Sequence, residues 1–222
     1  MASHLELEID KLKSVIVKIG ELAESQVVDA VKALLYEPFS EVKEVKKIEN
    51  KIDKLDVKID DICQGIFALQ QPVASDLRFI ISSMQISNEI ERIGDLAMSI
   101  IKQSKSIKEK HELISQFNIA EIAKDIELIT SKMNQCFIAL DETIIDEIFS
   151  LNNDVKSKSA DAIENIIVEM KNNSKKVISG THLVIALKHM ERIADHSSNV
   201  AESIYFMINA KTIKHEKFSD KK

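Results

Sequence analysis

The chain has 222 residues, of which 45% are hydrophobic and 30% charged, and its formal net charge at pH 7 is −6. This length accommodates one domain, or two of about a hundred residues, around a substantial core. The negative charge and the lack of a basic block with interleaved aromatic residues argue against nucleic acid as a partner. Because no apolar run approaches a membrane span and residues 1–13 lack the apolar segment of a signal peptide, we expect a cytoplasmic protein.

The first half of the chain predicts three helices. Only four glycines and two prolines occur in the whole chain, too few for the turns of a sheet protein, and apolar residues recur at helical spacing. We therefore expect an all-α fold, with helices over about 4–35, 39–69 and 73–103 and breaks at Pro38 and Pro72. In the middle helix, apolar residues alternate at intervals of four and three, as in a helix packed within a bundle.

The second half repeats this plan. A polar, lysine-rich stretch at residues 104–116 predicts a connector. Helices are expected at about 117–143, 145–172 and 175–210, and the charged tail covers 211–222. The chain as a whole is then six long helices in two tandem three-helix bundles, 1–103 and 117–210, related by internal duplication.

A pentad supports the duplication. Glu91-Arg92-Ile93-Gly94-Asp95 returns 100 residues later as Glu191-Arg192-Ile193-Ala194-Asp195, and only three of the 30 basic residues of the chain are arginines. A lysine supplies charge, but only the planar guanidinium holds a carboxylate through two hydrogen bonds. We therefore expect Arg92 and Arg192 to orient Asp95 and Asp195.

Acidic residues spaced four apart lie on one face of a helix, so Glu91 and Asp95 are neighbours. The preceding helix offers Glu49 and Asp53, and an antiparallel packing after Pro72 brings the four carboxylates to similar heights. Such a cluster suits hard cations, with iron, zinc, manganese and magnesium all conceivable. A solvated acidic face, or an arginine–aspartate salt bridge within the helix, explains the same spacing, and on the residues alone these interpretations stay open.

The second half is less complete. We interpret Asp154, 37 residues before Glu191, as the counterpart of Asp53, and its neighbour four residues earlier is Ser150 rather than an acid. The second site therefore lacks one ligand. No histidine has a glutamate three residues before it, which excludes a ferritin-like di-iron centre. His189 and His196 are interpreted as packing or surface residues, and Cys63 and Cys136 as buried thiols.

Three motifs together resemble the PhoU family of phosphate-uptake regulators: Gln71-Pro72-Val73-Ala74-Ser75-Asp76-Leu77-Arg78, the first pentad, and residues 191–202 beginning with the second pentad. The resemblance covers nearly the whole chain. It implies two three-helix bundles whose acidic motifs bind multinuclear metal clusters, with iron or zinc first among the candidates. The metal positions carried over are Glu49, Asp53, Glu91 and Asp95 on one surface, and Asp154, Glu191 and Asp195 on the other. Arg78, Arg92 and Arg192 are carried over as orienting residues.

The resemblance also implies a function. It predicts a homodimer, peripheral to the membrane through its partners, that restrains uptake by the phosphate ABC transporter and in many bacteria holds a phosphate-sensing histidine kinase inactive. No glycine-rich phosphate loop, nucleophile–base pairing or zinc-protease motif occurs in the sequence, so we expect a regulatory adaptor rather than an enzyme. The alternatives are a metal-dependent hydrolase of a phosphate compound and an accessory protein of a different phosphate carrier.

Overall fold

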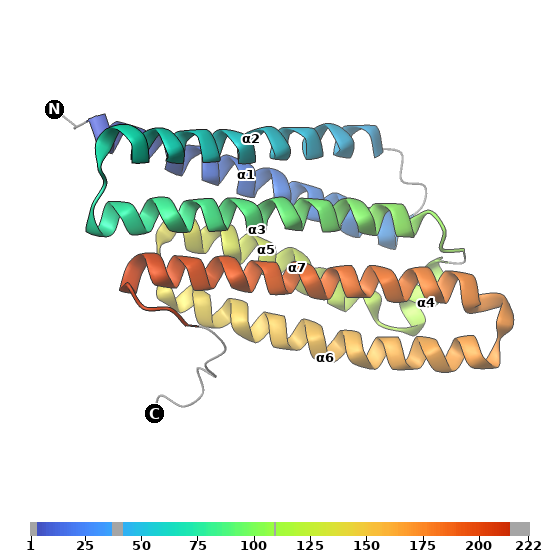
Figure 1. The fold of residues 1–222 in the computed structure, drawn as a ribbon. Helices are drawn as coiled ribbons and strands as arrows, with labels where there is room; N and C mark the ends of the chain where they lie inside the picture. The colour runs from blue at the N-terminus through green and yellow to red at the C-terminus, as the bar shows by residue number, and fades with distance from the viewer. Residues whose placement is uncertain (1–3, 37–41, 109, 214–222) are drawn as a thin grey trace, which may run out of the picture.

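The computed structural model describes residues 4–36, 42–108 and 110–213, and within these ranges the fold is all-α, as predicted (Figure 1). The predicted break at Pro38 lies outside the described residues. Two elements were not predicted, a short helix α4 (Lys110–Gln116) inside the connector and a 3-10 turn η1 (Ser174–Lys176). The six long helices are α1 (His4–Leu35), α2 (Val42–Gln70), α3 (Ala74–Ser104), α5 (Ile119–Ala139), α6 (Glu142–Asn172) and α7 (Val177–Asn209).

The six long helices form two three-helix bundles that share one core. Helices α1, α2 and α3 make the first bundle, α5, α6 and α7 make the second, and α3 and α7 lie side by side at the centre and run in opposite directions (Figure 1). The contact between α3 and α7 is the most extensive between any two described helices. A seam of residues at helical spacing on each of the two helices meets the other here, and every member is buried: Ile86, Ile90, Ile93, Ala97 and Ile100 on α3, and Ala186, Met190, Ile193, Ser197 and Val200 on α7.

Local chemistry sets the helix ends. Helix α2 ends before Gln71, whose φ of 46° is left-handed, and Pro72 then prevents the helix from continuing. The predicted boundary near residue 144 is a few residues late, because Leu140 adopts φ of 52° and ends α5. Asp141 then caps α6, since its Oδ1 accepts a 2.9 Å hydrogen bond from the backbone N–H of Thr143.

Cys63 and Cys136 are both free and buried, which confirms their interpretation as buried thiols. Burial raises the pKa of each thiol to about 12. None of the described helices combines the length and the apolar character that crossing a membrane requires.

Candidate functional site

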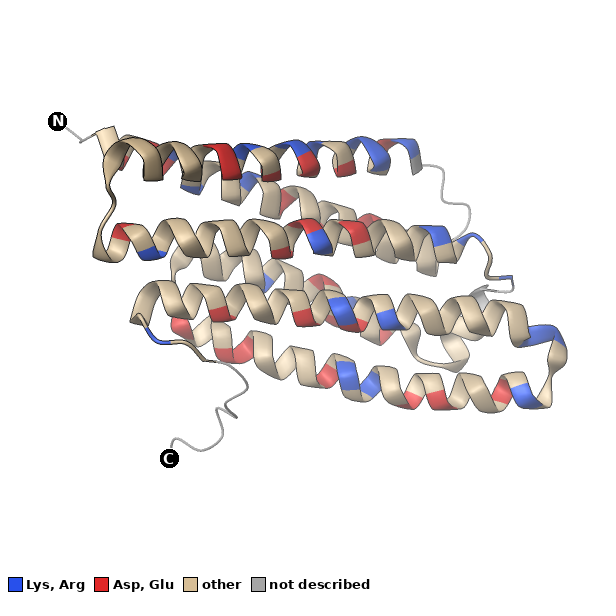
Figure 2. Cartoon of the chain, in the orientation of Figure 1, with Lys and Arg blue, Asp and Glu red and all other residues tan. Residues whose placement is uncertain are grey.

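Glu49, Asp53 and Asp56 on α2 and Glu91 and Asp95 on α3 are here called the first acidic face. The two helices run antiparallel, as predicted (Figure 1). The Oγ of Ser87 on α3 donates a 2.6 Å hydrogen bond to Oδ1 of Asp56 on α2, and this contact marks the register of the two helices. Figure 2 shows charged residues along α2 and a basic position flanked by acidic ones in the middle of α3. Acidic residues of α2 and α3 therefore lie on neighbouring antiparallel helices at this level.

The pKa of Glu91 reflects the acidic residues around it. Burial raises the pKa of Glu91, and the charge of Asp95 one helical turn away raises it further. Asp56 and Asp53, across the helix pair on α2, also raise the pKa of Glu91, and only the charge of Arg92 lowers it. Asp53, Asp56 and Asp95 thus lie near enough to Glu91 for their charges to act on it. Glu49 lies one turn from Asp53 along α2.

Arg92 does not orient Asp95. Its Nε lies 3.7 Å from Oε2 of Glu91, and 63% of its side chain is exposed. On this outer helix face the guanidinium extends into solvent, where a bond to the aspartate three residues on gains little. Among the described residues, no ion pair joins Asp53, Asp56 or Asp95 to a lysine or arginine. Within the described part of the chain, the basic partner of the first face is therefore Arg92, which pairs with Glu91 rather than with an aspartate.

The first face fits a hard cation in donor chemistry and in charge. Its side chains offer carboxylate oxygens, which Mg²⁺, Mn²⁺ and related ions prefer, and within the described residues their one basic partner is Arg92, 3.7 Å from Glu91. In their present arrangement, no three His, Cys, Asp or Glu side chains of the described residues form a group that could hold a metal ion. Asp53 and Asp95 are exposed, so their carboxylates are free to reorient.

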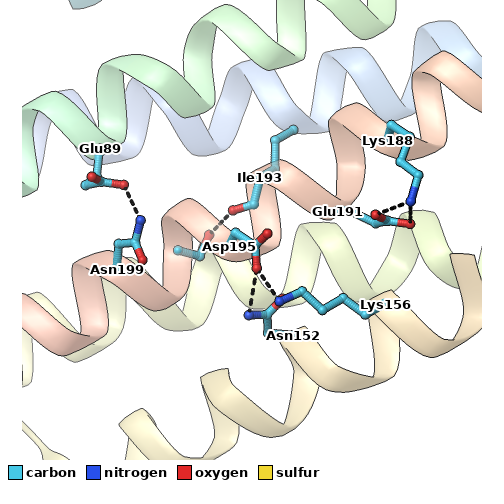
Figure 3. Close-up of polar contacts among 9 residues, drawn as sticks. Glu89, Asn152, Lys156, Lys188, Glu191, Ile193, Asp195 and Asn199 are labelled. Atoms are coloured by element: carbon cyan, nitrogen blue, oxygen red, sulfur yellow. Dashed lines mark hydrogen bonds and ion pairs between the residues drawn. The ribbon is translucent and has the colours of Figure 1, made fainter. Parts of the chain in front are cut away.

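The second acidic face, Glu191 and Asp195 on α7, differs from the first because lysines neutralise its carboxylates (Figure 3). Oδ1 of Asp195 lies 2.5 Å from the ammonium of Lys156 and accepts a 3.2 Å hydrogen bond from Nδ2 of Asn152. The ammonium of Lys188 donates to both oxygens of Glu191, at 2.9 and 2.7 Å. Arg192 is exposed and makes no ion pair with Asp195 within the described ranges, so the expected orienting contact is wrong in this repeat as well.

Burial also corrects the alignment of the repeats. Five of the six buried positions among the described residues of α2 have a buried counterpart 100 residues later on α6: Val45, Ile52, Ile59, Ile62 and Ile66 become Ile145, Asn152, Ser159, Ala162 and Ile166. This offset places Asn153, not Asp154, at the position of Asp53. The sequence interpretation is one residue out of register, because the positions that pack into the core, rather than the charges, set the phase of a helix.

The two histidines beside the second pentad have different surroundings. His189 is half-buried, its Nδ1 has no hydrogen-bond partner among the described residues, and burial followed by the charge of Arg192 lowers its pKa. His196 instead lies with Nδ1 2.7 Å from Oε2 of Glu89 on α3. Asn199 donates a hydrogen bond to the same oxygen (Figure 3). His189 is thus a packing residue, as interpreted, whereas His196 links the two bundles.

Sequence reasoning overlooked the partners of the second face, Asn152, Lys156 and Lys188. The sequence did contain a signal, the 100-residue offset between the pentads. Adding 100 to the number of Asp56 gives Lys156. Arg78, the third arginine, is half-buried near the start of α3, and its Nε has no hydrogen-bond partner among the described residues.

Both bundles match a known family separately. The model of the PhoU domain matches residues 16–104 and again residues 119–204, together most of the chain. The chain belongs to the PhoU family. The two PhoU repeats therefore coincide with the two bundles, and each carries one acidic face at the same place on its second and third helices.

Relatives match over nearly their whole length. The phosphate-specific transport system accessory protein PhoU homolog of Pseudomonas aeruginosa is 26% identical, over 97% of this chain and 89% of that protein. The protein of the same description from Clostridium acetobutylicum is 29% identical, over 94% and 95%. The crystal structure of PhoU from Pseudomonas aeruginosa superposes with a TM-score of 0.84 at 25% identity and covers 92% of this chain and 99% of that chain.

Proposed function

We propose that this chain is an accessory protein of a phosphate-specific transport system that restrains phosphate uptake from the cytoplasmic side through contact with the transporter. The observation that carries the proposal is the match of both repeats to the PhoU domain. It is supported by relatives that are named as accessory proteins of phosphate-specific transport and that align along almost the full chain. The same family membership supports a homodimer and, in organisms that have one, contact with a phosphate-sensing histidine kinase.

The exposed arginines support an action by contact. Arg92 and Arg192 lie on α3 and α7, the two adjacent central helices, and neither orients the aspartate of its own pentad. An exposed guanidinium can bind a carboxylate of a partner through two parallel hydrogen bonds, which an ammonium cannot do. We propose that both arginines belong to the surface that recognises the transport apparatus.

Uptake measurements test this function. In a strain that lacks the gene, phosphate uptake should no longer be repressed at high external phosphate, and the unmodified gene should restore repression. Co-purification with the transporter subunits, compared between cells grown at high and at low phosphate, should recover a complex. Normal repression of uptake in the deletion strain would contradict the regulatory proposal. Loss of repression in that strain, with no complex recovered by co-purification, would contradict the proposed contact with the transporter.

We also propose that the first acidic face binds a divalent or trivalent cation, with iron or zinc first among the candidates. Five acids, Glu49, Asp53, Asp56, Glu91 and Asp95, lie on or beside this face, and burial and mutual repulsion already raise the pKa of Glu91. A bound cation relieves that repulsion and supplies the missing positive charge. The protein residues hold the ion, and the proposed role of the ion is structural or regulatory.

Elemental analysis of protein purified without chelator tests cation binding. We expect bound metal that the double variant E91Q/D95N loses while its helical circular dichroism is unchanged, because neither side chain belongs to the apolar seam. Less than about 0.1 equivalent of metal in the unmodified protein, with no uptake on titration, would contradict the proposal.

A further inference from the structure

The second helix of each repeat places different charges beside the acids that both pentads share. In the register set by the buried seam, Asp53 and Asp56 of α2 correspond to Asn153 and Lys156 of α6. Two acids of the first face are therefore an amide and an ammonium on the second. The pentads themselves keep their glutamate and aspartate in both repeats, so the difference in charge between the two faces comes from α2 and α6.

Lys156 and Asn152 together hold Asp195 (Figure 3). Both contacts converge on Oδ1, at 2.5 Å for the ammonium and 3.2 Å for the amide nitrogen. Asn152 is only 8% exposed and stands where the first repeat has Ile52 in the apolar seam. Its Oδ1 is buried without a partner among the described residues, which is unfavourable for the core. The bond from its Nδ2 to Asp195 gives this polar residue a role that an isoleucine could not fill.

We propose that Lys156 gives the second face, from within the chain, the counter-cation that the first face takes from solution. The inference rests on the proposed cation binding of the first face. The Lys156 ammonium lies where a cation on Asp195 would have to bind, and Lys188 holds both oxygens of Glu191 in the same way. A metal ion would have to displace two lysines and would find fewer carboxylates. The second face is therefore closed to metal, and the response to cations belongs to the first repeat alone.

Titration of the full-length protein with Mn²⁺, followed by the paramagnetic resonance signal of the free ion, tests the role of Lys156. The background is the variant E91Q/D95N, in which the first face is disabled and which should take up no Mn²⁺. Adding N153D and K156D gives the second face the acids of the first, and we expect Mn²⁺ binding to be gained. The matched control adds N153D alone and keeps Lys156, and its affinity should be weaker by at least about tenfold.

Two results would overturn the inference. One is Mn²⁺ uptake by E91Q/D95N that the further pair E191Q/D195N removes, because the second face would then bind metal beside Lys156. The other is equal Mn²⁺ affinity of the variants with and without K156D, since Lys156 would then not prevent metal binding. If the N153D/K156D protein does not fold, the single change K156Q in the same background should still raise Mn²⁺ affinity, and an unchanged affinity would overturn the inference.

The test separates this inference from the proposed cation binding of the first face. Absence of bound metal in the unmodified protein, with no uptake on titration, would remove the first-face proposal. The comparison of N153D with N153D/K156D would then still decide whether Lys156 occupies the place of a cation.

Discussion

His196 on α7 lies with its Nδ1 2.7 Å from Oε2 of Glu89 on α3, so a polar contact joins the two repeats within their largest interface. Asn199 donates a second hydrogen bond of 2.9 Å to the same oxygen. The duplication does not reproduce this contact, because the positions 100 residues away are His189 and Leu96. The polar link therefore sets one relative placement of two otherwise similar bundles.

Replacing Glu89 with glutamine should make stability less dependent on pH. Burial alone would raise the pKa of Glu89, but hydrogen bonds from His196 and Asn199 and the charges of His196 and Arg92 outweigh burial and lower it. A lowered carboxyl pKa stabilises the folded state above the ordinary value of 4.5, and this contribution is lost as the pH falls through the folded-state pKa.

We expect the unmodified protein to exceed the Glu89→Gln variant by about 1 kcal/mol in free energy of unfolding near pH 7, with the difference vanishing in acid. Urea unfolding at several pH values measures it. The interpretation fails if the difference is the same at pH 3 and pH 7.

Replacing Gly94 with alanine should destabilise the first repeat although Ala194 occupies the same place in the second. A Cβ at Gly94 would meet Gln26 Oε1 at 3.1 Å and Ile52 Cδ1 at 3.2 Å. The counterpart of Ile52 is the polar Asn152, whose side chain has no Cδ1 methyl. Crowding should outweigh the gain in helix propensity, for a net loss of about 1 kcal/mol in free energy of unfolding.

The double variant G94A/I52V checks this reason for the loss, because Ile52→Val removes the Cδ1 methyl. In thermal unfolding, the loss caused by G94A should be smaller in the I52V background than in the unmodified protein. Additive losses would show that Ile52 is not the obstacle.

The double variant R92K/R192K should fold normally and lose control of phosphate uptake. Both side chains are exposed and hold no internal aspartate, so the melting temperature should stay within about 2 °C of the unmodified protein. Lysine keeps the charge but loses the two-pronged geometry for a carboxylate of the partner. Uptake in a deletion strain that carries the variant, beside one that carries the unmodified gene, provides the measurement. Normal repression would exclude the arginines from the contact.

Asp53→Ala and Asp154→Ala should differ in their effect on metal uptake. Asp53 belongs to the first acidic face and raises the pKa of Glu91, whereas Asp154 lies one residue beyond the position equivalent to Asp53. We expect Asp53→Ala to weaken Mn²⁺ binding at least about tenfold and Asp154→Ala to leave it unchanged. An equal loss in both variants would restore Asp154 as a ligand and would contradict the register set by the buried seam.

Sequence by itself determined the all-α fold, the six long helices and their duplication. These depend on local properties that the chain carries everywhere: helical spacing of apolar residues, scarce glycine and proline, and a pentad repeated at a distance of 100 residues. The antiparallel meeting of α2 and α3 followed from the single turn at Pro72. The end of α5 was predicted less well, because the left-handed conformation of Leu140 has no signal in a residue of that type.

Only the tertiary structure decided which charges meet. Spacing along a helix places Glu191 and Asp195 on one face, but whether their neighbours are acids or lysines depends on the phase of α6, which the burial of Ile145, Asn152 and Ile166 sets. The positions of the charges alone placed α6 one residue out of register with α2. Asp154 was therefore taken as the counterpart of Asp53, and Lys156 was overlooked. The contacts of Arg92 and Arg192 also could not be predicted from spacing. An i,i+3 spacing permits a salt bridge to the aspartate of the pentad, but each guanidinium is exposed and the salt bridge does not form.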